Sequence, residues 1–445
     1  MLEALNTLLW GPGTLALILG TGAWLTLRTG GFPQRNLGRA LTLSLGREAQ
    51  RKGRGGVSPF GSLMTALAST VGTGNIVGVA AALVSGGPGA LVWMELAAFL
   101  GLAAKFAECM LAVKYRHVRR DGTRWGGPMA VMETRLGSAG AVLGRFYALF
   151  ALLMAFAMGA MAQSGALADT FFAAFTLPRW RVGLVTAVLA LAILLGGIRR
   201  IAEISTVLVP VMALLYLGGG LAVILGNLRR LPEALILMLR CAVAPEAALG
   251  GALGIVTRRE ALRWGVARSV FSNEAGLGSA AITAACADTE DPVKQGLISM
   301  TGVFFDTMVI CTVTGLAICC SGTLGTADGA GRPLTGAALT LRAFETVLGP
   351  LAPWLIGVAL GLFAFTSVLG CAVQAETTAS YLLGPEAVRP CRVLYGLAVF
   401  VGAVIPMATV LQLADLANAL MAFPNLVCLL LLSGEIAGEC GRKER

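Results

Sequence analysis

Two glycine-rich interruptions inside apolar stretches have the residue types needed to hold a small charged molecule. The first is Val71–Gly78, with three glycines and Asn75, and the second is Phe271–Ser279, with two glycines and Asn273. Glycine is a poor helix former, so each segment predicts a break at which backbone groups lack helical partners. Freed amides at the start of one half-helix can hold a carboxylate, and freed carbonyls at the end of the other can hold a cation.

The two breaks occupy corresponding places in the two halves of the chain. The first follows the start of an apolar stretch at residue 58, and the second lies five spans later, in a unit that starts near residue 260. An odd number of spans per repeat places the two repeats in opposite orientations. One Gly-x-Gly alone favours close packing or a kink of a membrane helix, but paired breaks in two halves indicate the site of a secondary transporter.

Composition places the whole chain in a membrane. Hydrophobic residues make up 56% and charged residues 13% of the 445 residues, which is about half the usual share of charge. This excludes an ordinary soluble enzyme, a disordered scaffold and a secreted disulfide module. One span needs about 20 apolar residues. The apolar stretches predict an all-α integral membrane protein of eleven spans. One is a broken span within 232–287, and the other ten are 8–27, 58–84, 89–113, 140–168, 182–197, 201–226, 293–321, 350–383, 392–405 and 407–434.

Basic residues between the spans predict the orientation. The segment after the first span is rich in Lys and Arg and carries one acid, Glu48. By the positive-inside rule it is cytoplasmic, so we expect the N-terminus outside and the C-terminus in the cytoplasm of a bacterial inner (plasma) membrane. Arg229 and Arg230 fall outside and count mildly against this. The inside residues are Arg28, Arg35, Arg39, Arg47, Arg51, Lys52, Arg54, Lys114, Arg116, Arg119, Arg120, Arg124, Arg199, Arg200, Arg389, Arg392, Arg442, Lys443 and Arg445.

Few residues are available for catalysis or metal binding. His117 is the single histidine, and the ten cysteines include no Cys-x-x-Cys pair. Neither a histidine metal site nor an intramembrane enzyme is therefore expected. Because the loops account for the net charge of +10, the expected surrounding is a lipid bilayer and not a nucleic acid. We expect a monomer.

Seven strings, in order along nearly the whole chain, carry a family resemblance: Val71–Ala80, Gly86–Met94, Gly126–Met129, Trp264–Arg268, Phe271–Ser279, Phe305–Thr307 and Leu420–Leu426. They resemble the alanine or glycine:cation symporters (sodium:alanine symporters), of the amino acid-polyamine-cation superfamily. The resemblance implies a LeuT-type fold, with two inverted five-helix repeats after one extra helix. It also implies sodium-coupled import of a small neutral amino acid, chiefly alanine or glycine, with Na⁺ as coupling ion and no other cofactor.

The implied division of the chain is a single transporter domain with four parts. The extra helix and basic linker occupy 1–57, the first repeat 58–228, the second repeat with outer helices 229–435, and the cytoplasmic tail 436–445.

The resemblance implies a sodium site between the first break and the helix that contains Thr366 and Ser367. The two hydroxyls would complete a shell of oxygens with the carbonyls near Ala68, Val71 and Gly72. Sodium needs about five such oxygens, by analogy with other hard cations. The alternative is that both hydroxyls bond back to their own helix.

The implied substrate site draws on both breaks. The amides of Thr73 and Gly74 are expected to hold the substrate carboxylate, while each break's asparagine either holds substrate or stabilises the unwound backbone. Gln163 either meets the substrate or makes an interhelical hydrogen bond. The complete expected set is Gly72, Thr73, Gly74, Asn75, Gln163, Ser272, Asn273, Gly276, Phe365 and Cys371.

The string Gly370–Glu376 departs from the family pattern, in which a tryptophan and two tyrosines follow the glycine. If Cys371 faces the substrate, the loss of these large rings predicts a wider pocket. A somewhat larger neutral amino acid is then an alternative to alanine.

Charged residues inside spans are functional candidates because their burial is costly. Lys105 and Glu108 lie three apart on one helix and are expected to pair with each other. Glu274 is expected to act in a gate or helix cap, and Asp306 to bind neighbouring backbone or a cation.

Two alternatives to sodium-coupled symport stay open. Glu95 and Glu376 are protonatable and allow proton coupling in place of sodium, and Asp415 has no assigned role. A sensor would bind an amino acid without transporting it. Paired internal half-sites argue against a channel, whose selectivity groups often form rings across subunits.

Overall fold

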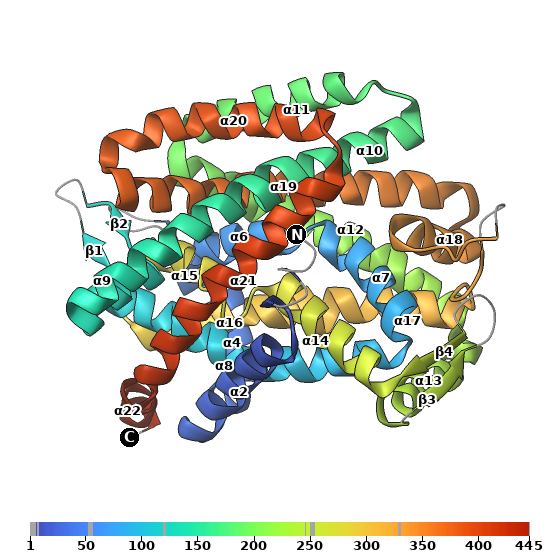
Figure 1. Cartoon of the computed structure of the whole chain (residues 1–445), viewed down its shortest axis with the longest axis horizontal. Coiled ribbons are helices and arrows are strands. Elements are labelled where there is room, and N and C mark those ends of the chain that lie inside the picture. Colours follow the sequence, from blue (N-terminus) through green and yellow to red (C-terminus); the bar gives the residue numbers. More distant parts are fainter. Residues whose placement is uncertain are drawn as a thin grey trace.

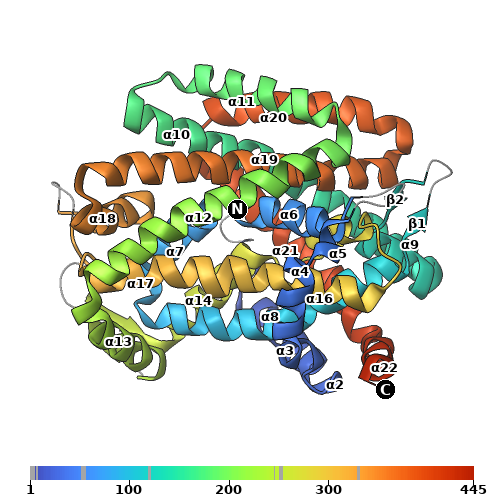
Figure 2. The same cartoon turned by 180° about the vertical axis from the view of Figure 1, so that it is seen from behind.

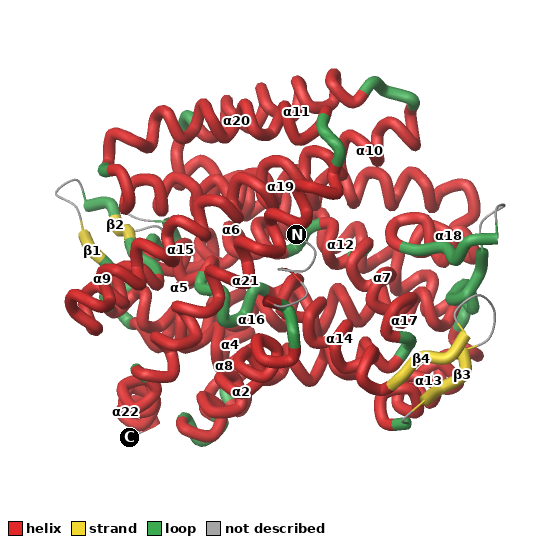
Figure 3. The backbone as a smooth tube through the Cα atoms, viewed as in Figure 1, coloured by secondary structure: helices red, strands yellow, loops and turns green. Residues whose placement is uncertain are grey.

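Helices make up nearly all of the described chain, as the apolar stretches predict (Figure 3). A backbone in a bilayer must satisfy its polar groups internally, and a helix does so within one segment. The computed structural model describes residues 6, 9–51, 57–118, 122–244, 246–249, 254–327 and 331–444. Five of the basic residues used for the orientation lie outside the described residues: Lys52, Arg54, Arg119, Arg120 and Arg445.

The first half of the chain contains the first broken helix. Its described elements are α2 (Pro12–Arg28), α3 (Phe32–Arg35), α4 (Leu37–Leu45), α5 (Arg47–Gln50), α6 (Pro59–Thr70), a 3₁₀ turn (Thr73–Asn75), α7 (Val77–Gly86), α8 (Gly89–Lys114), β1 (His117–Val118), β2 (Arg124–Trp125), α9 (Pro128–Met154), a π-helical segment (Ala155–Ala162), α10 (Gln163–Phe175), α11 (Arg179–Leu194) and α12 (Gly197–Gly226).

The second half contains the second broken helix. Its described elements are α13 (Leu231–Val243), β3 (Glu246–Leu249), β4 (Gly254–Thr257), α14 (Arg258–Asn273), α15 (Ser279–Ala285), α16 (Pro292–Val303), a second π-helical segment (Phe304–Cys311), α17 (Thr312–Ser321), α18 (Gly336–Leu348), α19 (Ala352–Leu383), α20 (Val388–Val404), α21 (Met407–Leu431) and α22 (Ser433–Glu444). Short 3₁₀ turns precede α13, α19 and α20.

Some element boundaries differ from the predictions. The apolar stretch expected at 140–168 belongs to a helix that begins at Pro128, because a further helical piece precedes the stretch and joins it across a kink at Gly137 (φ 62°). The antiparallel hairpin that pairs β3 with β4 is absent from the predictions, which placed one or two short helices between residue 232 and the start of the second broken span. One helix, α13, is found there.

The count of helices long enough to cross a membrane is lower than eleven in the described chain. Seven helices are long and apolar enough, or eight when α6 and α7 are joined across their 62° bend. The other predicted spans fall on shorter elements, since α2 has 17 residues and α11 and α14 have 16 each. The protein is therefore an all-helical multi-span chain, and the number eleven stays a prediction.

The two broken helices run in opposite directions through the middle of the molecule. The β1–β2 hairpin lies at one end of the long axis, and α13, β3 and β4 lie at the other (Figure 1). The chain passes from α6 near the first end to α7 near the second, and then from α14 near the second end to α15 near the first. The reverse view places α6 and α7 in the same order relative to the two ends (Figure 2).

Packing surrounds both breaks with buried apolar side chains. One cluster contains Val71 and Ile76 of the first break, and another contains Leu277 of the second. Helix α8 packs along α14 and α16, whereas α11 and α20 lie side by side at one edge (Figures 1 and 2). The breaks are thus enclosed by protein, the condition under which irregular backbone is tolerated at membrane depth.

Candidate functional site

The first break is organised by the side chain of Asn75, which is completely buried. Its Oδ1 accepts the Gly72 N–H at 3.0 Å. Its Nδ2 lies 2.8 Å from Asp306 Oδ1 and 3.1 Å from Ser272 Oγ. Asn75 therefore stabilises the unwound backbone, which is one of its two expected roles, and also ties this break to the second broken helix.

The Asp306 carboxylate lies against the first break and is completely buried. Besides Asn75, it accepts the hydroxyl of Ser272 at 2.5 Å and that of Thr307 at 2.9 Å. Its described hydrogen-bond donors are side chains and not backbone groups, and no described lysine or arginine forms an ion pair with it, so the pairing of Asp306 with a cation stays a prediction. Asp306 belongs to the second π-helical segment, a feature often found at functional sites.

Of the two hydroxyls expected at a sodium site, Ser367 lies beside the break. Its Oγ is 3.5 Å from the Val71 carbonyl oxygen, and a β-carbon on Gly72 would come within 2.8 Å of it. Only glycine at position 72 leaves that hydroxyl its place. Helix α19 also approaches Ala68 closely, since a β-carbon on Gly370 would lie 2.9 Å from the Ala68 carbonyl carbon.

The Thr366 hydroxyl bonds back to its own helix, which was the alternative to a sodium ligand. Its hydroxyl is 2.9 Å from the Leu362 carbonyl of its own helix and 3.2 Å from Met212 Sδ on α12. The structure thus places Ser367 at the break and Thr366 toward α12.

The expected substrate residues of the first half come together on one side of the break. Thr73 donates its hydroxyl to Gln163 Oε1 at 3.3 Å, and Gln163 also faces Gly72. A β-carbon on Gly74 would lie 3.9 Å from Phe271 Cδ1. Gln163 therefore makes an interhelical hydrogen bond at the site, and its buried amide opens α10 directly after the first π-helical segment.

Two further expected residues, Phe365 and Cys371, lie on α19, the helix that also contains Ser367. A β-carbon on Gly159 would lie only 2.2 Å from Cys371 Cβ, so the Cys371 side chain is packed against the backbone of the first π-helical segment. Phe365 packs against the apolar cluster that contains Cys371. Cys371 therefore contacts Gly159, and any effect of Cys371 on the width of the pocket would act through this contact.

Side chains of the second break and of the second π-helical segment form hydrogen bonds that hold the second break in place. Asn273 accepts the Ala275 N–H at 2.9 Å and donates to Thr307 Oγ1 at 3.0 Å. Glu274 caps α14 in a left-handed conformation (φ 53°), and its carboxylate accepts the Ser279 hydroxyl. This is the cap expected for Glu274.

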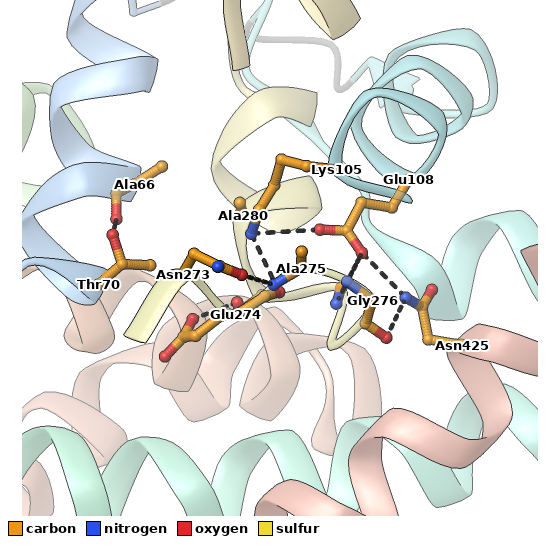
Figure 4. Close-up of polar contacts among 12 residues, drawn as sticks. Ala66, Thr70, Lys105, Glu108, Asn273, Glu274, Ala275, Gly276, Ala280 and Asn425 are labelled. Carbon is orange, nitrogen blue, oxygen red and sulfur yellow. Dashed lines mark hydrogen bonds and ion pairs between the residues drawn. The ribbon is translucent and has the colours of Figure 1, made fainter. Parts of the chain in front are cut away.

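A buried ion pair occupies both ends of the second break (Figure 4). Lys105 Nζ lies 3.3 Å from Glu108 Oε1, as the spacing predicts, and donates to the Glu274 carbonyl at 3.0 Å. Glu108 Oε2 accepts the N–H groups of Gly276 at 3.2 Å and Gly278 at 3.1 Å. An ammonium thus meets the carbonyl end of α14, and a carboxylate meets the amide end of α15.

Asn425 on α21 completes this arrangement, which the sequence did not reveal. Its Nδ2 lies 3.1 Å from Glu108 Oε2 and 2.9 Å from the Gly276 carbonyl (Figure 4). An asparagine in an apolar helix, in one of the strings of the family resemblance, is the signal that could have identified it.

Two other acids in spans have hydrogen-bond partners of their own. Glu376 accepts two hydrogen bonds from Arg392, each of 2.8 Å, and Glu95 accepts the Thr312 hydroxyl at 2.8 Å. Glu376 of α19 is thereby held in a largely buried ion pair with Arg392 of α20.

A cation at the first break would be bound by oxygen atoms. Among the described residues, no group of three or more His, Cys, Asp or Glu side chains is placed to hold a metal ion. The oxygens gathered at the first break are the Val71 carbonyl, the Ser367 hydroxyl and, on its other side, the Asp306 carboxylate. Hard oxygens of this kind suit an alkali cation.

Comparison with known proteins gives the family. Residues 1–441 match the model of the sodium:alanine symporter family. An uncharacterized transporter of Haemophilus influenzae is 44% identical over 432 residues, which is 97% of this chain and 92% of that protein. The sodium/alanine symporter AgcS of Methanococcus maripaludis is 41% identical over 444 residues, 99% of this chain and 96% of that one.

The fold is that of LeuT-type transporters. MhsT, solved in complex with L-phenylalanine, matches 85% of this chain and 90% of its own with a TM-score of 0.60, at 14% sequence identity. An identity this low shows the fold alone. The full-length family match and the two sequence relatives go further: the chain is a multi-pass membrane transporter and belongs to the sodium:alanine symporter family, which comprises sodium-coupled amino acid symporters and not enzymes.

Proposed function

We propose that this protein imports a small neutral amino acid together with Na⁺, and that both bind at the first break. The observation that carries this is the difference in charge between the breaks. Asp306 brings a buried carboxylate to the first break and has no ion-pair partner among the described residues, while the second break already contains Lys105. A buried carboxylate without a paired cation favours a mobile cation, because an uncompensated buried charge is costly.

In this proposal Na⁺ binds the Val71 carbonyl and the Ser367 hydroxyl, with Ala68, Gly72 and Thr366 completing the oxygen shell. The amides of Gly72, Thr73 and Gly74 hold the substrate carboxylate, and Gln163 reaches the substrate from α10. Ser272, Asn273, Gly276, Phe365 and Cys371 complete the expected set around the substrate.

The proposed architecture is that of eleven spans, with an outer N-terminus and a cytoplasmic C-terminus. An extra helix and linker (1–57) precede inverted repeats at 58–228 and 229–435, and a tail follows (436–445). The opposite directions of α6–α7 and α14–α15 support the inversion. The β1–β2 end of the molecule is then cytoplasmic, and the α13 end faces outside.

Coupling follows from the shared break. A cation that binds between α6 and α19 orders the break that also presents the substrate amides, so each ligand raises the affinity for the other by the same factor. Alternating access then requires that the ligands bind the outward-open and inward-open states with different affinities.

Uptake of labelled alanine by the purified protein in liposomes tests the proposal. We expect accumulation under an inward sodium gradient and none without it. Accumulation driven by a proton gradient alone would show that protons are the coupling ion in place of sodium. Glu95 would then be the residue to test. Binding without accumulation under any gradient would identify a sensor.

Asn75→Ala is expected to abolish sodium-driven uptake while folded protein is retained. The change removes the acceptor of the Gly72 N–H and a donor to Asp306, at a cost of about 1–3 kcal/mol in stability. Size-exclusion chromatography and uptake check the two parts separately. Uptake equal to wild type would refute the assignment of the site.

Competition by larger neutral amino acids measures how far the packing of Cys371 against Gly159 sets the substrate size.

A further inference from the structure

A cavity of about 240 Å³ lies where α4 packs across α16 (Figure 2), and its lining contains no residue of either break. Part of the lining is apolar and comes from Phe32, Leu43, Val293 and Leu297. The rest consists of charged side chains. At about 30 Å³ for each water molecule, the volume corresponds to roughly eight waters, or to a phosphate group with part of its glycerol.

The charged side chains of the lining leave one positive charge without an opposite charge. Glu48 accepts from Lys294 Nζ at 2.7 Å, and Asp291 accepts from Lys443 Nζ at 2.6 Å, so both acids are already paired. The remaining charged group is Arg39, which is exposed and forms no ion pair with any described residue. The cavity therefore favours a ligand with one negative charge that accepts from a guanidinium, as a phosphodiester does.

The position of α4 brings this cavity to the level of lipid headgroups. Helix α4 belongs to the basic segment after the first span, which the proposed orientation places on the cytoplasmic side. Ser44 Oγ lies 3.1 Å from Thr301 Oγ1, about 14 Å along α16 from its first residue at 1.5 Å per residue. The helix thus reaches from the cytoplasmic side into the predicted span, and basic side chains at this boundary attract anionic lipids.

An apolar crevice begins beside the C-terminal end of α4. Leu45, the last residue of α4, is 62% exposed and lines a second cavity, of about 260 Å³, together with Phe60 and Leu63 of α6 and Leu214 of α12. The lining of this crevice is apolar throughout. Burial of a hydrocarbon chain there is favourable, whereas a free phosphate ion gains nothing from it. The charged cavity and the crevice together match a molecule with an anionic head and an apolar tail.

We infer that the charged cavity binds the phosphate of an anionic phospholipid from the cytoplasmic leaflet, and that Arg39 selects its negative charge. Lys294 and Lys443 contribute further donors to the phosphate oxygens, and an acyl chain lies in the crevice beside Leu45. The inference uses the proposed orientation of the chain. It depends neither on the coupling ion nor on the transported amino acid.

Native mass spectrometry of the full-length protein in detergent tests this inference. The probes are phosphatidylglycerol, which carries one negative charge, and phosphatidylcholine with the same acyl chains, which carries no net charge. We expect phosphatidylglycerol to bind about fivefold more tightly, which is the effect of one basic side chain at a membrane surface. Inorganic phosphate should not displace it. Displacement by inorganic phosphate would make the free ion the ligand and would overturn the lipid assignment.

Variants of the lining should shift this preference in opposite directions. Arg39→Gln should reduce the preference for phosphatidylglycerol to nearly none, and Arg39→Lys should keep most of it. Glu48→Gln leaves Lys294 without its acid and should raise the preference by about a further fivefold. Arg47→Gln is the matched control, because Arg47 is an exposed arginine of the neighbouring α5 and does not line the cavity. It should leave the preference unchanged.

Two results would overturn the site. Equal binding of the two lipids by the wild-type protein would remove the selection for charge. Equal losses in Arg39→Gln and Arg47→Gln would show a diffuse attraction to the whole basic segment in place of a defined cavity. If Arg39→Gln does not fold, Glu48→Gln decides, since an unchanged lipid preference in that variant contradicts the charge balance of the cavity. Uptake in liposomes tests the proposed function separately.

Discussion

The two breaks contain similar residues but balance their buried charge differently. At the second break the Glu108 carboxylate faces Lys105, and each of the two also binds backbone of the break. At the first break the Asp306 carboxylate is held by hydroxyl and amide donors only, among the described residues. The second break contains a tethered cation, Lys105, and its other carboxylate, Glu274, accepts the Ser279 hydroxyl. No described lysine or arginine forms an ion pair with Asp306 at the first break.

The difference indicates which break changes state during transport. A lysine ammonium cannot leave with the substrate, so we expect the second break to keep the same contacts whether or not sodium is bound. Asn425 adds α21 to those contacts. The first break, in contrast, gains its missing positive charge only when a cation binds, and its geometry can therefore respond to that cation.

Lys105→Ala is expected to have the largest effect. It leaves Glu108 buried without its cation, and breaking a buried pair from one side costs about 3–5 kcal/mol. We expect a sharp loss of thermal stability in detergent and little folded protein, as measured by unfolding followed with fluorescence and by the yield of monodisperse protein.

The control removes both charges. Lys105→Met together with Glu108→Gln keeps an amide oxygen for the Gly276 and Gly278 N–H groups and should recover most of the stability. The sodium concentration at half-maximal uptake should equal that of wild type. A changed sodium dependence in this double variant would show that the second break shares in the cation site, contrary to the comparison.

Asp306→Asn is expected to act on sodium more than on stability. The amide keeps the shape of the side chain but removes the negative charge at the first break. We expect the sodium concentration at half-maximal uptake to rise roughly tenfold to hundredfold, equivalent to about 1.4–2.7 kcal/mol. Glu274→Gln removes a buried carboxylate from the second break and should leave the sodium dependence unchanged. Equal shifts in both variants would contradict the distinction between the breaks.

Ser367→Ala should have a smaller effect, because it removes one neutral ligand. We expect the sodium half-saturation to rise about threefold to tenfold, which corresponds to a single hydrogen-bond-sized contribution of about 1 kcal/mol. Thr366→Ala separates the two interpretations of that residue. A shift similar to that of Ser367→Ala would make Thr366 a ligand, and no shift would leave it as a hydroxyl bonded to its own helix.

The sequence was sufficient to predict the breaks because their signal is local. Glycines within a few residues and a neighbouring asparagine mark Val71–Gly78 and Phe271–Ser279, and a spacing of three on one helix marks the pairing of Lys105 with Glu108. The LeuT-type fold could also be anticipated, since strings along nearly the whole chain carried the resemblance. These features depend on residues that are close in the chain.

The sequence could not predict partners that only the fold brings together. Asp306 meets Asn75 from 231 positions away, and Asn425 meets Glu108 from 317 positions away. The contact between Cys371 and Gly159 depends in the same way on how α19 packs against a π-helical segment. The β3–β4 hairpin was missed for a different reason, because two four-residue strands carry too short a pattern to be distinguished from a loop.

The smallest expected effect concerns the end of the second broken helix, where charged contacts continue beyond the spans. Asp291, the N-cap of α16, accepts the Lys443 ammonium of α22 at 2.6 Å and the Lys294 N–H at 3.1 Å. Burial tends to raise the pKa of the Asp291 carboxyl, but these two donors outweigh it, so its pKa lies below the ordinary value. The depressed pKa adds stability above the unfolded pKa of about 3.9, and that stability is lost as the pH falls through the lower, folded value.

Lys443→Gln should therefore lower the free energy of unfolding by less than about 1 kcal/mol at pH 7, since the pair is partly exposed. The difference from wild type should shrink below about pH 4, when Asp291 takes up its proton. Arg442→Gln removes the same charge from the same helix at a more exposed pair and should change stability by a few tenths of a kcal/mol at most. Thermal unfolding at pH 7 and at about pH 2.5 measures both variants. If Lys443→Gln instead altered the sodium dependence of uptake, the ion pairs at this end would belong to the moving part of the transporter, and the second break would not be the fixed one.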